Sequence, residues 1–161
     1  MGSKIIRYPF APKSALSLKP GQFWALPLSD GSFGCAAVIQ LMPKEMMGAR
    51  VSFLAGVLDW HGEELPSAES IAHSSCLKQG GVHFKTITET GGFILGYRPL
   101  EANGIEPWTF RDAEGWKNSN LVRGFVAIRP QTPEDSQLPV FSTWGFKTPL
   151  IIAESRFINN G

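Results

Sequence analysis

The sequence predicts a mainly β (α+β) protein, in which a single strongly bent antiparallel sheet or small barrel has one clear helix packed on it. Short apolar runs alternate with turn signals along the chain, which is typical of paired strands. The 17 glycines and 12 prolines favour turns and short strands over long helices. With 161 residues, the chain is long enough to bury a core without disulfides. We expect one domain over 1–161, with 1–18 as an irregular N-terminal arm whose apolar side chains pack on the rest.

A β-hairpin over 19–41 is the element that the local signals define best. Pro20-Gly21 predicts the turn that starts it, and Ser29-Asp30-Gly31-Ser32 predicts the turn between its arms. Pro27 donates no ladder hydrogen bond, which places the first arm at an edge or a bulge there. Gly34 and its alanine neighbours leave room for close approach of another backbone or for a sharp bend of the sheet. Side-chain alternation assigns one face of the second arm to a core. Its residues are Phe33, Cys35, Ala37, Ile39 and Leu41.

The segments that follow predict a central strand and the helix. Residues 51–58 are apolar on both faces, which is typical of a strand covered on both sides. Ser67 as N-cap, Glu69 in the first turn and Gly80-Gly81 as the stop predict a helix over 67–78. Its small-residue face would lie flat on the sheet.

The second half predicts shorter elements. Residues 82–88 and 93–97 alternate in polarity around a glycine-containing turn, which predicts a second hairpin. Residues 100–120 read as loop with a helical turn, and 121–129 as a strand. The proline-bounded segment 130–139 predicts a polar loop, and the apolar run 150–153 predicts a last short strand.

The first hairpin also carries a resemblance to a known family. A Gly-aromatic start, an Ala-Leu-Pro-Leu strand, an Asp-Gly turn and a Phe-Gly strand resemble the opening of the immunity protein 26 family of bacterial polymorphic-toxin systems. The matching residues are Gly21, Phe23, Ala25, Pro27, Leu28, Asp30, Gly31, Phe33 and Gly34. Residues 92–96, followed by Pro99-Leu100, resemble a later Gly-hydrophobic-Gly segment of that family. The resemblance implies a β-rich, non-enzymatic immunity protein that neutralises a bacterial toxin by protein–protein interaction.

Charge and composition narrow the kind of partner. The formal net charge is +1, with 15 basic and 14 acidic residues, so there is no bulk attraction to nucleic acid or to an anionic membrane. No apolar run reaches membrane-spanning length, and the two cysteines lack metal-site or disulfide-framework spacing. We therefore expect a cytoplasmic protein with no membrane or nucleic-acid partner. The family resemblance implies a cognate toxin domain as its partner.

One loop supplies the candidate partner-binding residues. The segment between Arg50 and Lys78 contains acidic residues but no lysine or arginine. Trp60 lies within this acidic stretch, as an interface anchor surrounded by charge would. The alternative is a half-buried tryptophan with a structural role. The residues assigned to partner binding are Asp59, Trp60, His61, Glu63 and Glu64. Their negative charge would steer encounter with a basic toxin.

The sequence predicts no catalytic, cofactor or metal site. The three histidines lie far apart without metal-ligand spacing, and Cys35 and Cys76 fall on apolar faces, as core thiols do. A different class of function stays open. The chain could be a β-barrel binding module for a peptide or nucleic acid, with Trp60, Trp108 or Trp116 as an aromatic floor. A small enzyme that uses His61 and the nearby carboxylates is the third and least supported hypothesis.

Overall fold

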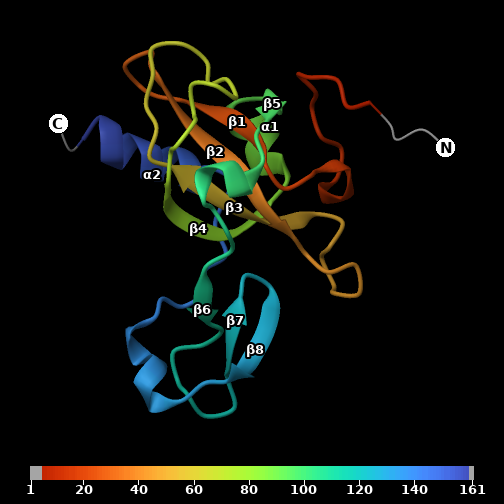
Figure 1. Cartoon of the computed structure of the whole chain (residues 1–161), viewed down its shortest axis with the longest axis vertical. Helices are drawn as coiled ribbons and strands as arrows, with labels where there is room; N and C mark the ends of the chain where they lie inside the picture. The colour runs from red at the N-terminus through yellow and green to blue at the C-terminus, as the bar shows by residue number, and fades with distance from the viewer. Residues whose placement is uncertain (1–4, 160–161) are drawn as a thin grey trace.

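The structure, a computed structural model, describes residues 5–159; residues 1–4 of the predicted arm and residues 160–161 lie outside it. The chain forms two antiparallel sheets (Figure 1). The larger has the order β4-β3-β2-β1-β5, with β1 Gln22–Pro27, β2 Phe33–Leu41, β3 Ser52–Leu58, β4 Cys76–His83 and β5 Gly96–Tyr97. The smaller has the order β6-β7-β8, with β6 Thr109–Arg111, β7 Asn120–Arg123 and β8 Val126–Pro130.

The predicted mainly β (α+β) class is confirmed. The strands form two sheets where one was predicted, and within residues 5–159 the larger sheet stays open, with β4 and β5 at its edges. The α-helices are α1 Lys85–Thr90 and α2 Thr148–Phe157, and the 3-10 helices are η1 Ala15–Ser17, η2 Leu100–Asn103 and η3 Pro133–Gln137. Among the described residues, no helix combines the length and apolarity needed to cross a bilayer.

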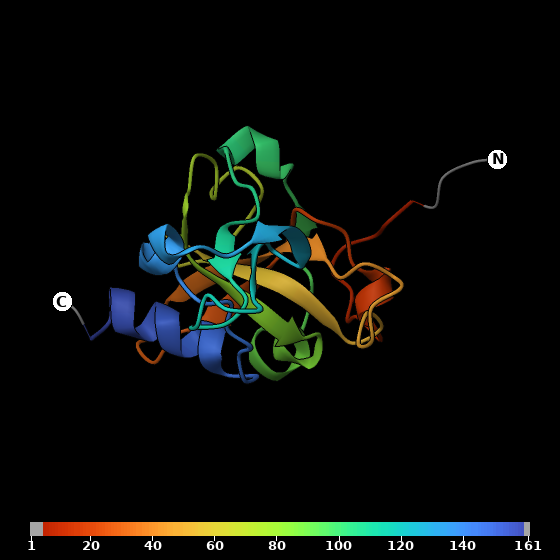
Figure 2. The ribbon, with the colours of Figure 1, turned by 90° about the horizontal axis from the view of Figure 1, so that it is seen from below.

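The predicted first hairpin is confirmed. Strands β1 and β2 pair antiparallel, and Pro27 is the exposed last residue of β1, beyond the short stretch that β5 covers. Both faces of β2 are buried, whereas the sequence assigned only one face to a core. The second face is covered because α2 packs on β1, β2 and β3, and Ala153 lies against Gly34 (Figure 2). At Gly34 the neighbour is the side chain of Ala153 in this helix, and not the other backbone that the sequence led us to expect.

The strand predicted over 51–58 is also confirmed, since β3 lies between β2 and β4 and is buried from Phe53 to Leu58.

The N-terminal arm packs on the core along only part of its length. Tyr8 and Phe10 pack against the core, and Phe10 exchanges two backbone hydrogen bonds with Ile94 at 3.1 and 2.8 Å. Ile5 and Ile6 stay exposed, so their predicted packing is wrong.

The helix predicted over 67–78 is wrong. The N-cap signal does form a turn, because Ser67 and Ser70 exchange side-chain-to-backbone hydrogen bonds of 2.8 and 3.1 Å. His73 then adopts a left-handed φ of 67°, which ends the turn, and β4 begins at Cys76. Gly80 is a strand residue whose missing Cβ makes room for the Trp144 indole.

Other elements of the second half also differ from the prediction. Residues 85–90 form α1 and β5 pairs with β1, so the second predicted hairpin is wrong. The run 150–153 lies in α2, which packs on the larger sheet, so the short strand predicted there is wrong. Pro149 is compatible with the first helical turn, where its missing N–H is not needed. Residues 121–129 contain two paired strands with Gly124 at their turn, and the predicted loop over 130–139 contains η3. The helical turn expected within 100–120 is present as η2, and β6 follows it.

Residues 106–141 form a lobe that extends from the larger sheet (Figure 1). Two glutamine side chains of the larger sheet bind its backbone. Gln79 bridges Glu106 O and Trp108 N at 3.0 and 2.9 Å, and Gln40 Oε1 accepts the Phe125 N–H at 2.8 Å. The lobe is therefore attached by specific polar contacts as well as by its two connecting segments.

Asp135 braces this lobe, and its ionisation predicts a pH effect. Arg129 donates two hydrogen bonds to the carboxylate, each 2.9 Å long, and the Thr132 N–H donates a third. These donors, Arg129 first, lower the pKa of Asp135 from 3.8 to about 2. Because the unfolded chain then binds the proton more tightly, this contribution to stability is complete above pH about 5 and is lost toward pH about 2.

We expect the Asp135→Asn variant to lose this part of the acid sensitivity. Denaturation in urea between pH about 5 and about 2 measures it, because the free energy of unfolding should fall less steeply than in the wild-type protein. Glu114→Gln, at an exposed acid of the same lobe, is the matched control and should keep the wild-type slope. Equal slopes for all three proteins would contradict the bracing role.

Candidate functional site

The predicted partner-binding loop continues directly from β3 and is fixed at both ends by backbone hydrogen bonds. The Asp59 N–H donates to Ser75 O at 2.8 Å. Gly62 and Phe33 exchange two hydrogen bonds of 2.8 and 3.0 Å, which join the loop to the start of β2. The loop therefore has a defined place beside the β1–β2 turn.

Three of the five predicted residues make contacts that limit what they offer to a partner. Asp59 pairs with Arg156 of α2, with N–O distances of 3.3 Å, so its charge is partly neutralised. Trp60 is half-buried and packs on the core beneath the loop, where it occupies the space that a Cβ at Gly62 would need. His61 stacks on Phe157, with ring centroids 5.1 Å apart. Trp60 thus supports the loop, and a partner contact by it stays a prediction.

Asp30, Ser32 and His61 form a hydrogen-bonded chain at the same place. Ser32 Oγ donates to Asp30 Oδ1, and His61 Nε2 lies 2.7 Å from Ser32 Oγ. The hydroxyl and the backbone N–H of Ser32 lower the pKa of Asp30, so its carboxylate is ionised and accepts the hydrogen bond that the hydroxyl donates. His61 must then donate to Ser32 rather than remove its proton. This hydrogen-bonded chain of side chains stabilises the turn. Its middle member is Ser32, whereas the histidine is the middle member of a Ser-His-Asp relay.

Glu63 and Glu64 are exposed. On the neighbouring α2, Glu154 accepts hydrogen bonds from the backbone N–H and hydroxyl of Ser29. Five carboxylates lie at one end of the larger sheet, because three segments contact one another there: the β1–β2 turn, the 59–64 loop and α2. We call this surface the acidic end; its members are Asp30, Asp59, Glu63, Glu64 and Glu154. Within the described part of the chain, Arg156 is the one basic side chain in an ion pair with it.

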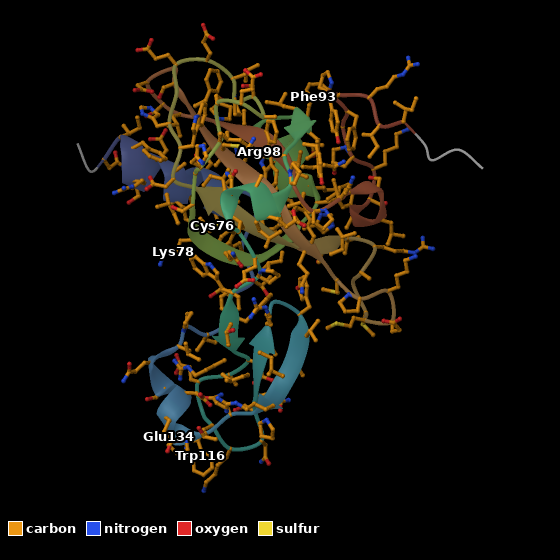
Figure 3. All side chains as sticks on the ribbon, in the orientation of Figure 1. Cys76, Lys78, Phe93, Arg98, Trp116 and Glu134 are labelled. Atoms are coloured by element: carbon orange, nitrogen blue, oxygen red, sulfur yellow. The ribbon has the colours of Figure 1, made fainter. Side chains whose placement is uncertain are left out.

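The sequence identified part of the acidic end and missed the rest. Asp59, Glu63 and Glu64 were found because they are close in the sequence. Asp30 and Glu154 were missed because they join the surface only through the fold, and the segment of Glu154 was not expected to be helical. Lys78 of β4, labelled in Figure 3, lines a groove beside α2 with Arg156, so basic side chains border the surface on that side.

The described residues give no support to metal or thiol chemistry. Between residues 5 and 159, no cluster of three or more His, Cys, Asp or Glu side chains could hold a metal ion. Cys35 and Cys76 are free and packed in the core. Burial raises the pKa of the Cys76 thiol to about 11 and that of Cys35 well above its usual range, so both stay protonated at neutral pH.

The tryptophans considered as an aromatic floor lie in three different places. Trp60 lies under the acidic end, Trp108 lines an open cleft with residues of the lobe, and Trp116 lies at the far end of the lobe (Figure 3). They form no common surface.

Comparisons of the chain with protein-family models, with curated proteins and with solved structures found no match.

Proposed function

We propose that this protein is an immunity protein that neutralises a basic toxin domain by binding it at the acidic end. One observation carries the proposal: carboxylates from three separate segments converge on one surface, although the whole chain is nearly neutral. The resemblance of the first hairpin to the immunity protein 26 family supports the toxin as the class of partner. Opposite charges would speed the encounter, which suits an inhibitor that must act before its toxin does.

Within the acidic end, Glu63 and Glu64 should contribute most to this steering. Both are exposed, and in the described structure neither is part of an ion pair. Asp59 is already paired with Arg156, and Asp30 and Glu154 accept hydrogen bonds from neighbouring serines. The partner's cations can therefore approach the two glutamates without first displacing an intramolecular contact.

Capture of the partner is the first experiment. The purified protein serves as bait in a lysate of its source organism, and the retained proteins are identified by mass spectrometry. Recovery of the C-terminal part of a large secreted protein in a stoichiometric complex, together with suppression of its toxicity, would support the proposal. Salt-dependent recovery of oligonucleotides instead would favour a nucleic-acid-binding module.

A charge-reversed variant tests the surface once the partner is in hand. We expect Glu63→Lys/Glu64→Lys to slow association by at least about tenfold at low salt, and by much less at high salt, where exposed charges are screened. Stopped-flow or surface-based kinetics measures the rate. The control, Glu114→Lys/Glu134→Lys, makes the same change in net charge on exposed residues of the lobe and should associate at the wild-type rate. An unchanged rate for the first variant would contradict binding at the acidic end.

A further inference from the structure

A second surface lies at the opposite end of the larger sheet. Strand β3 begins at Ser52, beside this surface, and ends at Leu58, beside the acidic end. Here an open groove of about 460 Å³ runs between the N-terminal arm and the β2–β3 connection. Figures 1 and 2 show these two segments side by side. The volume lies within the range of binding sites, about 300–1,000 Å³.

Backbone hydrogen bonds within the chain hold the walls of this groove in place. Its two walls are joined by the Ala15 N–H, which donates to Arg50 O at 2.7 Å. The connection itself is a series of tight turns, with Met46 N bound to Pro43 O at 3.0 Å and Val51 N bound to Gly48 O at 3.0 Å. A preformed groove binds at a lower entropic cost than one that must be ordered.

Apolar side chains line the groove, and several apolar side chains on the segments that form it are exposed to solvent. Leu16, Leu41 and Met42 contribute to its lining. Leu16 is 50% exposed, and on the β2–β3 connection that supplies the other wall Met46 is 41% and Met47 99% exposed. Single exposed apolar residues are ordinary, but several on the two segments that form one groove are typical of an interaction site. Methionine is suited to such a site because its flexible, polarizable side chain adapts to a partner.

Two cations give the groove its charge preference. Lys44 and Arg50 line it, both are exposed, and neither is in an ion pair among residues 5–159. A partner that fills the groove would bring its own charged groups within reach of both. Acidic groups are therefore the complement that this surface lacks.

We propose that this groove binds an amphipathic segment of a partner protein, in which acidic residues flank regularly spaced apolar anchors. The apolar anchors would occupy the groove, and the acidic residues would pair with Lys44 and Arg50, as in other complexes of a helix in a groove. A lipid surface fits less well, because a bilayer is flat and this site is a groove between two walls. This inference does not depend on the proposed function, which concerns the other end of the sheet.

A displayed library of random peptides tests the proposal with the whole protein. We expect selected peptides to have a net negative charge and apolar residues at positions i, i+3 or i+4, and i+7. They should bind the Lys44→Glu/Arg50→Glu variant at least about tenfold more weakly than the wild-type protein. Lys117→Glu/Lys147→Glu, with the same charge change on exposed lysines elsewhere, is the control and should bind as the wild type does. Thermal unfolding should be alike for all three proteins, since the substituted side chains are exposed.

Three results of the peptide selection would contradict the proposal. No enrichment, enrichment of basic or uncharged peptides, or equal binding by the Lys44→Glu/Arg50→Glu variant would overturn the proposal. A second experiment tests binding of the protein to vesicles that contain an anionic lipid. Retention on them that is lost in the same variant would show that the groove and its cations serve a membrane instead.

Discussion

Replacing Trp24 with alanine should lower the free energy of unfolding by about 3–5 kcal/mol. Trp24 is a residue of β1 with 0% exposure, and its indole meets Phe53 edge to face, with centroids 6.0 Å apart. Its Nε1–H donates to Thr90 Oγ1 at 3.2 Å, which connects the central sheet to the last residue of α1. Truncation leaves a cavity and also removes this hydrogen bond.

Equilibrium denaturation in urea measures the loss. The matched control is Trp116→Ala, at a tryptophan that is 48% exposed at the far end of the lobe, and it should change stability by less than about 0.5 kcal/mol. Trp24→Phe, which fills most of the space but lacks the donor, should fall between the wild type and Trp24→Ala. Similar losses for Trp24→Ala and Trp116→Ala would contradict the central role of Trp24.

The sequence was informative where the signals for an element lie within the element itself. The turn Ser29-Asp30-Gly31-Ser32 and the apolar arms beside it specify a hairpin locally, because Asp30 accepts the Ser32 N–H at 2.9 Å and Gly31 has a φ of 88°. Strand β3 was likewise predicted, since it is apolar on both faces and lies in the centre of the sheet.

Predictions were wrong where distant contacts decide the structure. Gly80-Gly81 was interpreted as a helix stop, but these glycines lie in β4 and are covered by Trp144 and Phe141, about sixty residues later in the chain. Isolated sequence patterns contain no trace of that packing. Ile151 and Ile152 have high β-propensity, yet they lie in α2 because the helix packs on the sheet, where Ala153 meets Gly34.

The acidic end shows the same division. Glu63 and Glu64 could be named from the sequence because they are adjacent. That Asp59 is paired with Arg156, and that Trp60 is packed beneath the loop, follows only from the position of α2 and of the core. Charge patterning therefore located the surface, whereas the fold determines which of its carboxylates are free to meet a partner.

The glycine at the end of α1 allows a second large stability effect to be separated into its causes. A Cβ at Gly91 would overlap with the carbonyl oxygen of Ala25, in buried β1. A backbone oxygen held in the sheet cannot rotate away as a side chain can, so the helix would have to move. Gly91 has a φ of −85°, which any residue adopts, so the cost of Gly91→Ala is steric. We expect it to lower the free energy of unfolding by about 3 kcal/mol.

Two other glycines provide the controls for this measurement. Gly92 has a φ of 93° and open space around it, so Gly92→Ala should report backbone strain alone, about 1–2 kcal/mol. Gly115 has neither feature, so Gly115→Ala should change stability by less than about 0.5 kcal/mol. Urea denaturation measures the free energy of unfolding of the three variants. Equal losses for Gly91→Ala and Gly115→Ala would contradict the close packing of α1 on β1. Because Gly91 and Trp24 join the same two elements, we expect the double variant to lose less than the sum of the single losses, since either change alone already loosens α1 from β1.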